Sequence, residues 1–246
     1  MELLKPADGA PIGRVIFAPY AGSSCYAYYG IANTLPARVE CLGFDYPGRL
    51  TRPSEAFVSD IQTLGTEFAE VISRDVSIPT VLFGHSMGAF VAYEAASRLA
   101  GVRDQHIAAV ILSCQRPPQA ASKPPYLHEM GDEDLVEELR RMGGVPDDVI
   151  EDIDALKYLA PILRSDSLAC ATYKNVRERV LPCPIHLYYG DEDESFSEEN
   201  IAQWSSLTGG GVKARIFGGG HFYFKGSYKN FVVALNEDVA ASFRGH

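Results

Sequence analysis

The sequence predicts an α/β protein built on a mostly parallel sheet, and two observations support this prediction. Short apolar runs typical of buried strands alternate with longer segments of helical periodicity, and a Gly-x-Ser-x-Gly motif joins one such strand to a helix. Because parallel strands need a crossover between them, the alternation favours a parallel sheet with helices on both faces. The 246 residues suit a single domain of this kind.

The motif lies in Val81–Ala89, where an apolar run leads directly into a helix pattern rich in small residues. This arrangement is typical of a nucleophile elbow, a sharp strand-to-helix turn that lifts a serine above the sheet. Gly84 and Gly88 are the residues needed where strand and helix come close. Gly-x-Ser-x-Gly alone is weak, but the strand before it and the helix after it supply the required context. We therefore predict that Ser86 is a nucleophile.

The other elements follow from apolar runs and periodicity. Strands are expected at 14–19, 39–44, 109–113, 185–189 and 213–217. Helices are expected after the loop 20–24 to about residue 33, over 58–72, after the elbow, after an N-cap at Ser197, and at the end of the chain.

The alternation breaks between residues 116 and 180. A loop interrupted by Pro117, Pro118, Pro124 and Pro125 is followed by helices without strands. The first helix begins with acidic residues at 132–134 and ends with two arginines before Gly143, the charge order that the helix dipole favours. We expect one α/β domain over residues 1–246 in which 116–180 form a helical lid at the active-site end of the sheet; the alternative is a peripheral helical pair.

A serine nucleophile needs a base, and the base needs a carboxylate that fixes its tautomer. With this kind of elbow, the acid and then the histidine follow the serine, each after a strand. His221 fits as the base because it follows the last strand and three glycines. His85 adjoins the serine and should point away from its hydroxyl, and the other histidines lie too early, within a strand or at the chain end.

The acid is expected in the cluster Asp191–Glu194, after the strand at 185–189. Asp193 is preferred because a turn starting at Gly190 needs about three residues to bring a side chain back over the strand end, and Asp191 is the alternative. The residues at 113–116 contain no acid, which excludes that earlier position. The oxyanion of a tetrahedral intermediate would be held by the amides of Met87 and Ala21, unless the loop containing Ala21 is a plain turn.

Charge and composition exclude several function classes. The net charge of −10 argues against nucleic-acid binding, and an acidic protein partner would need a local basic patch. Arg49 with Arg52, or Lys225 with Lys229, could form one, although solvated surface charge is the simpler interpretation of each.

There is no apolar run of membrane-spanning length and no signal peptide. The five cysteines show no metal-binding or disulfide pattern, so we expect buried reduced thiols at Cys41, Cys114 and Cys183 and a cytoplasmic protein.

Six segments together form a pattern that is far more specific than Gly-x-Ser-x-Gly alone: 17–22, 47–49, 83–89, 142–146, 161–166 and 219–223. In these segments, and over nearly its whole length, the chain resembles the stand-alone type II thioesterases of non-ribosomal peptide and polyketide synthases. The resemblance implies an α/β-hydrolase fold with a helical lid, Ser86, Asp193 and His221 as catalytic triad, and oxyanion amides at Ala21 and Met87. Tyr20 departs from the family pattern, which usually has histidine there, and its side chain is not expected to take part in the chemistry.

The resemblance also implies the substrate, namely acyl groups on the phosphopantetheine arm of acyl or peptidyl carrier proteins, removed when they stall a synthase. Integral thioesterase domains are similar but usually place the acid after the earlier strand. We expect a monomer that needs no metal and no organic cofactor. Two alternatives stay open: a carboxylesterase or lipase acting on oxygen esters, and a non-catalytic relative that only binds a ligand.

Overall fold

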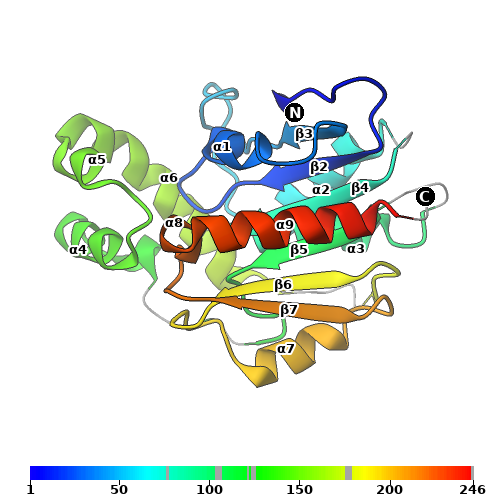
Figure 1. Ribbon diagram of the computed structural model, residues 1–246. Helices are drawn as coiled ribbons and strands as arrows, with labels where there is room; N and C mark the ends of the chain where they lie inside the picture. Colours follow the sequence, from blue (N-terminus) through cyan, green and yellow to red (C-terminus); the bar gives the residue numbers. More distant parts are fainter. Residues whose placement is uncertain (76–77, 103–106, 121, 123–125, 175–178, 245–246) are drawn as a thin grey trace.

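The protein is described by a computed structural model, which describes all residues except 76–77, 103–106, 121, 123–125, 175–178 and 245–246. A seven-stranded sheet has the order β1-β3-β2-β4-β5-β6-β7, and helices lie on both of its faces (Figure 1). Only β1 is antiparallel to its neighbour, and the other strand pairs are parallel. The predicted α/β fold with a mostly parallel sheet is confirmed.

The strands are β1 (Glu2–Lys5), β2 (Gly13–Ala18), β3 (Val39–Gly43), β4 (Thr80–His85), β5 (Ile107–Ser113), β6 (Ile185–Gly190) and β7 (Val212–Phe217). The helices are η1 (Cys25–Tyr28), α1 (Tyr29–Ala32), α2 (Ile61–Ile72), α3 (Met87–Leu99), η2 (Leu127–Glu129), α4 (Asp132–Met142), α5 (Asp147–Glu151), α6 (Ile153–Thr172), α7 (Glu198–Ser205), α8 (Tyr223–Gly226) and α9 (Tyr228–Ser242).

Alternate residues of each central strand enter two separate cores. In β4, Leu82 belongs to the core that includes residues of α2, α3 and α7, whereas Val81 and Phe83 belong to the core that includes residues of α1 and α9. Both sets are apolar because both faces of the sheet are covered, so the strand is a continuous apolar run rather than an alternating one. At the sheet edge, α9 is held to β7 by buried Asp238, whose carboxylate accepts hydrogen bonds from Lys213 and Arg215.

Four short elements among the described residues were missed in the sequence. β1 has four residues and buries only Leu4, so pairing with β3 rather than its own pattern decides its structure. η2, α5 and α8 have three, five and four residues, too short for a periodic signal. The helical segment after β2 covers residues 25–32, close to the expected extent, but its first half is the 3-10 helix η1 and only the single turn α1 is α-helical.

Between β5 and β6 the described residues form η2, α4, α5 and α6, which have a small apolar core of their own. Figure 1 shows α4 and α5 projecting beyond one end of the sheet. Gly143 ends α4 with φ 67°, and the N-cap of α7 is Ser197, as expected. Pro124 and Pro125, two of the four prolines in the loop before these helices, lie outside the described residues. Within the part of the chain that the structure describes, no helix combines the length and apolarity needed to cross a bilayer.

Candidate active site

Ser86 lies at the sharp turn between β4 and α3. Its φ of 53° and ψ of −123° lie outside the regions that L-residues favour. The turn is possible because its neighbours are glycines: a Cβ on Gly84 would lie 2.1 Å from the carbonyl oxygen of Gly88, and a Cβ on Gly88 would lie 2.1 Å from that of Ala18. Ser86 is partly exposed, and its amide donates to the carbonyl of Ser113 at 2.8 Å. The local geometry is that of a nucleophile elbow.

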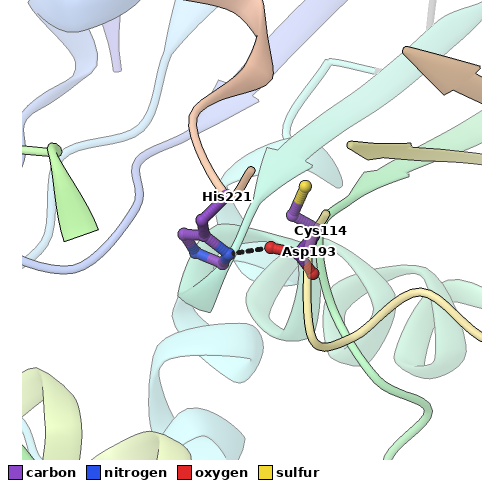
Figure 2. Close-up of side chains that lie close together, drawn as sticks. All are labelled: Cys114, Asp193 and His221. Carbon is purple, nitrogen blue, oxygen red and sulfur yellow. Dashed lines mark hydrogen bonds and ion pairs between the residues drawn. The ribbon is translucent and has the colours of Figure 1, made fainter. Parts of the chain in front are cut away.

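The turn after β6 brings Asp193 to His221, 28 residues further along the chain. Nδ1 of His221 is 2.5 Å from Oδ2 of Asp193. Figure 2 shows this hydrogen bond as a dashed line between the two side chains. The other carboxylate oxygen accepts hydrogen bonds from the amide and the hydroxyl of Ser195. A Cβ on Gly190 would lie 2.1 Å from the carbonyl oxygen of Gly219, so the glycine loop that carries the histidine is packed directly on the end of β6.

These contacts keep Asp193 ionised. Burial acts to raise the pKa of its carboxyl, but the hydrogen bond and charge of His221, together with the Ser195 donors, lower the pKa to about 2. Only 2% of the Asp193 side chain is exposed, whereas 25% of the His221 side chain is exposed. The alternative acid, Asp191, instead accepts a hydrogen bond from the amide of Gly219 at 2.8 Å and stabilises the glycine loop.

His221 also lies beside the elbow, since its ring centroid is 5.0 Å from that of His85, the residue before Ser86. Among the described residues, the structure shows the link between His221 and Asp193 but no hydrogen bond from Ser86 Oγ to His221. Such bonds are often long in enzymes without substrate and tighten when substrate binds.

The first expected oxyanion donor, Met87, is the first residue of α3, and the second, Ala21, follows β2. Gly88 lets the start of α3 approach the backbone of Ala18 and Pro19, at the entry to the loop that contains Ala21. Tyr20, the departure from the family pattern, packs edge-on against His85 with ring centroids 5.7 Å apart.

His85 is fully buried below His221, and Nδ1 lies 2.9 Å from the hydroxyl of Ser113. That hydroxyl is 3.0 Å from the phenolic oxygen of Tyr223. Burial, and then the positive charge of protonated His221, lower the pKa of His85 well below its usual value. His85 therefore stays neutral, and its hydrogen bond points to β5 rather than to the serine, in agreement with the expectation that it points away.

Cys114, at the end of β5, completes a cluster with Asp193 and His221 in which one potential ligand atom from each residue lies within 4.8 Å of the others (Figure 2). These residue types can bind zinc. However, two ligands at about 2.0 Å from a tetrahedral zinc ion are about 3.3 Å apart. The 2.5 Å between His221 Nδ1 and Asp193 Oδ2 suits a direct hydrogen bond instead. Cys114 is a buried free thiol, as are Cys41 and Cys183, which the composition predicted.

The suggested basic patch at Arg49 and Arg52 is wrong. Arg49 is 4% exposed and forms a bidentate ion pair with Asp166 of α6. Arg52 forms ion pairs with Glu55, three residues further along the chain, and with Glu67 of α2. Lys225 is exposed, but its ammonium donates to the carbonyl of Gly143 at 2.6 Å. The Arg49–Asp166 pair was not recognised in the sequence as a unit, because its members are 117 residues apart.

The sheet topology, the strained serine and the paired acid and histidine define the chain as an α/β-hydrolase. A family model described as "Thioesterase domain" matches residues 14–240. The chain belongs to the thioesterase family, and the resemblance to its type II members is confirmed.

Individual relatives agree with this assignment. The solved structure of the type II thioesterase BorB, from the borrelidin biosynthetic cluster, superposes with a TM-score of 0.87 at 31% identity, covering 99% of this chain and 97% of that one. Thioesterase PikA5 of Streptomyces venezuelae is 30% identical over 95% of this chain and 83% of that protein. A probable cadicidin biosynthesis thioesterase of Streptomyces griseus is 34% identical over 96% of this chain, which spans only 63% of that protein.

Proposed function

We propose that this enzyme hydrolyses acyl thioesters on the phosphopantetheine arm of carrier proteins, and that it removes stalled or aberrant acyl groups from polyketide or non-ribosomal peptide synthases. The hydrogen bond between His221 and Asp193 beside the strained Ser86 is the main observation in support. The relatives described above, which are type II or biosynthetic thioesterases, support the substrate class.

In the proposed mechanism His221 removes the hydroxyl proton of Ser86, whose oxygen attacks the thioester carbonyl. Ionised Asp193 holds the Nδ1 proton of His221, so that Nε2 is the nitrogen that accepts the serine proton. The amides of Met87 and Ala21 stabilise the oxyanion.

The intermediate collapses with release of the phosphopantetheine thiol, which takes the proton from His221. A water molecule is then deprotonated by His221 and attacks the acyl-serine ester. The second intermediate releases the carboxylic acid and restores Ser86 with its proton. A thioester has a good leaving group, and this suits an enzyme that accepts many acyl chains.

The remaining expectations concern the surroundings of the site. We propose that α4, α5 and α6 act as a lid, since the loop at Gly144 packs against Phe222, the neighbour of His221. All five cysteines are free thiols, which supports a reducing compartment such as the cytoplasm. Light scattering tests the expectation of a 26.9 kDa monomer.

The decisive experiment compares wild type with Ser86→Ala on one acyl group presented in two ways, as the thioester of a carrier protein and as a simple alcohol ester. We expect hydrolysis of the carrier thioester to be preferred and to fall at least about 10³-fold in the variant. Preference for the alcohol ester would favour a carboxylesterase. If wild type hydrolyses neither substrate and a fluorophosphonate does not label Ser86, the chain is a non-catalytic binding protein.

A further inference from the structure

The loop that contains Ala21 is held at three backbone positions by buried side chains. Tyr46 donates its hydroxyl to the carbonyl of Pro19 at 2.8 Å. The amide of Gly22 donates to Asp166 at 2.8 Å, and Arg49 donates to the carbonyl of Ser23 at 3.2 Å. These contacts lie on both sides of Ala21, and those at residues 22 and 23 come from a single ion pair.

That pair joins two distant parts of the chain. Arg49 lies in the loop after β3 and Asp166 lies on α6, and two parallel hydrogen bonds of 2.8 and 2.6 Å connect them. The side chains are 4% and 0% exposed, and the guanidinium carbon is 4.9 Å from the ring centroid of Tyr46. The geometry is a bidentate, charge-assisted contact closed off from water.

The backbone around Arg49 is strained. Leu50 has φ 30° although it is not glycine, and its side chain is 57% exposed. Gly48, on the other side, has φ 83°. Strain of this kind persists only where the surrounding structure imposes it, and here the buried ion pair of Arg49 lies between the two residues.

Stability alone is a poor explanation for such a pair, because burying two charges costs as much as their attraction returns. The pair does fix the orientation of the peptide groups next to the Ala21 amide. We propose that Arg49 and Asp166 are positioning residues that hold the Ala21 amide in the orientation needed for the oxyanion; this inference rests on the proposed function. Both act through the loop and neither touches the substrate.

The pair also makes part of α6 a fixed component of the active site. Leu163 of α6 packs so closely on Gly22 that a Cβ there would lie 2.5 Å from a leucine methyl. Further along α6, Ala169 belongs to the main core beside the sheet. If the lid opens, α4 and α5 therefore move while this part of α6 stays in place, because its departure would release the oxyanion loop.

Three variants test the proposal. Asp166→Asn keeps an oxygen for the Gly22 amide but loses the charge. Asp166→Ala loses both, and leaves Arg49 buried without its partner, so it risks failure to fold. The double variant Arg49→Met/Asp166→Leu removes both charges together and should remain folded, while the loop loses its contacts. Asp238→Asn is the control, because it breaks a buried charged network between α9 and β7.

We expect kcat of the folded double variant to fall at least about tenfold. The largest expected fall is about 10²–10³-fold, which is the effect of losing one oxyanion donor completely. KM should change less than about twofold. Affinity for an acyl trifluoromethyl ketone, which forms an oxyanion on the serine, should fall by the same factor as kcat/KM. Affinity for a non-hydrolysable thioether analogue should not change. Asp238→Asn should retain kcat once the folded fraction is accounted for, and Asp166→Asn should show a smaller loss than the double variant.

The proposal is overturned if the folded double variant keeps wild-type kcat and wild-type affinity for the ketone. If the double variant does not fold, the same result for Asp166→Asn overturns it. Equal losses of ketone and thioether affinity would assign the pair a purely structural role and would also overturn it. An inactive wild type, or a Ser86→Ala variant as active as wild type, would refute the proposed function instead, so the two failures can be distinguished.

Discussion

We expect the strained backbone of Ser86 to lower the free energy of unfolding of the protein by an amount that can be measured. Its φ of 53° and ψ of −123° suit glycine, and its side chain makes no capping hydrogen bond that a substitution would remove. Ser86→Gly relieves the strain, whereas Ser86→Ala keeps the Cβ that causes it. The comparison of these two inactive variants isolates the backbone contribution from the loss of the hydroxyl.

A residue held in such a sparsely populated region costs about 1–3 kcal/mol. The greater freedom of glycine in the unfolded chain offsets about 0.4–1 kcal/mol of the gain. We therefore expect Ser86→Gly to be about 1 kcal/mol more stable than Ser86→Ala. For a chain of 246 residues this corresponds to a Tm higher by about 2–4 °C.

Calorimetry and urea unfolding of the two variants measure the difference. Ala240→Gly serves as the control, because this exposed residue in α9 has ordinary helical backbone and glycine should cost about 1 kcal/mol there. A Ser86→Gly variant that is no more stable than Ser86→Ala, with the control behaving normally, would refute the idea that the elbow stores strain.

Three further predictions concern the neighbours of the serine and the sheet edge. Gly88→Ala should lower activity at least about tenfold while the protein stays folded, because its Cβ would lie 2.1 Å from the carbonyl oxygen of Ala18 and must displace the oxyanion loop; steady-state kinetics check this. In an Asp193→Asn background, Cys114→Asp should raise the hydrolysis rate at least about tenfold over Asp193→Asn alone, whereas Cys114→Asn should not. The reason is that Sγ of Cys114 lies within 4.8 Å of a ring nitrogen of His221, and that the φ of 48° at residue 114 is one that aspartate tolerates. Burial alone would raise the pKa of Asp238, but hydrogen bonds from two basic side chains of β7 hold it below its ordinary value. The stability that this carboxylate contributes is thus present above its unfolded pKa of about 3.9 and lost as pH falls through the folded value, so Asp238→Asn should cost about 3 kcal/mol at pH 7 and progressively less below about pH 4 in urea unfolding.

Much of the fold was predictable because its signals are local. β4 and β5 are buried on both faces and therefore appear as nearly continuous apolar runs. The start and end of α4 follow from acidic residues in its first turn and Gly143 at its end. β1 was not predictable, because four residues contain too little pattern and only pairing with β3 orders them.

The candidate site divides in the same way. Ser86 has a sequence signature because the elbow constrains its immediate neighbours. The order of the triad residues along the chain narrowed the candidate histidines to His221. The sequence did not separate Asp193 from Asp191 as the acid, since both follow the same strand. In the structure Asp193 is hydrogen-bonded to His221, and Asp191 accepts a hydrogen bond from the amide of Gly219. The assignment of these residues to catalytic roles stays a prediction until the variants are measured.

By itself the sequence determined the α/β architecture, the position of the turn that carries Ser86 and the thioesterase family, because each depends on residues that are neighbours in the chain or stand in a fixed order. Only the tertiary structure decided that Arg49 is buried against Asp166 instead of forming a basic surface, and that Cys114 lies beside the acid and the histidine. Such contacts join residues up to 117 positions apart, and their formation depends on how the sheet and α6 pack, which no local pattern encodes.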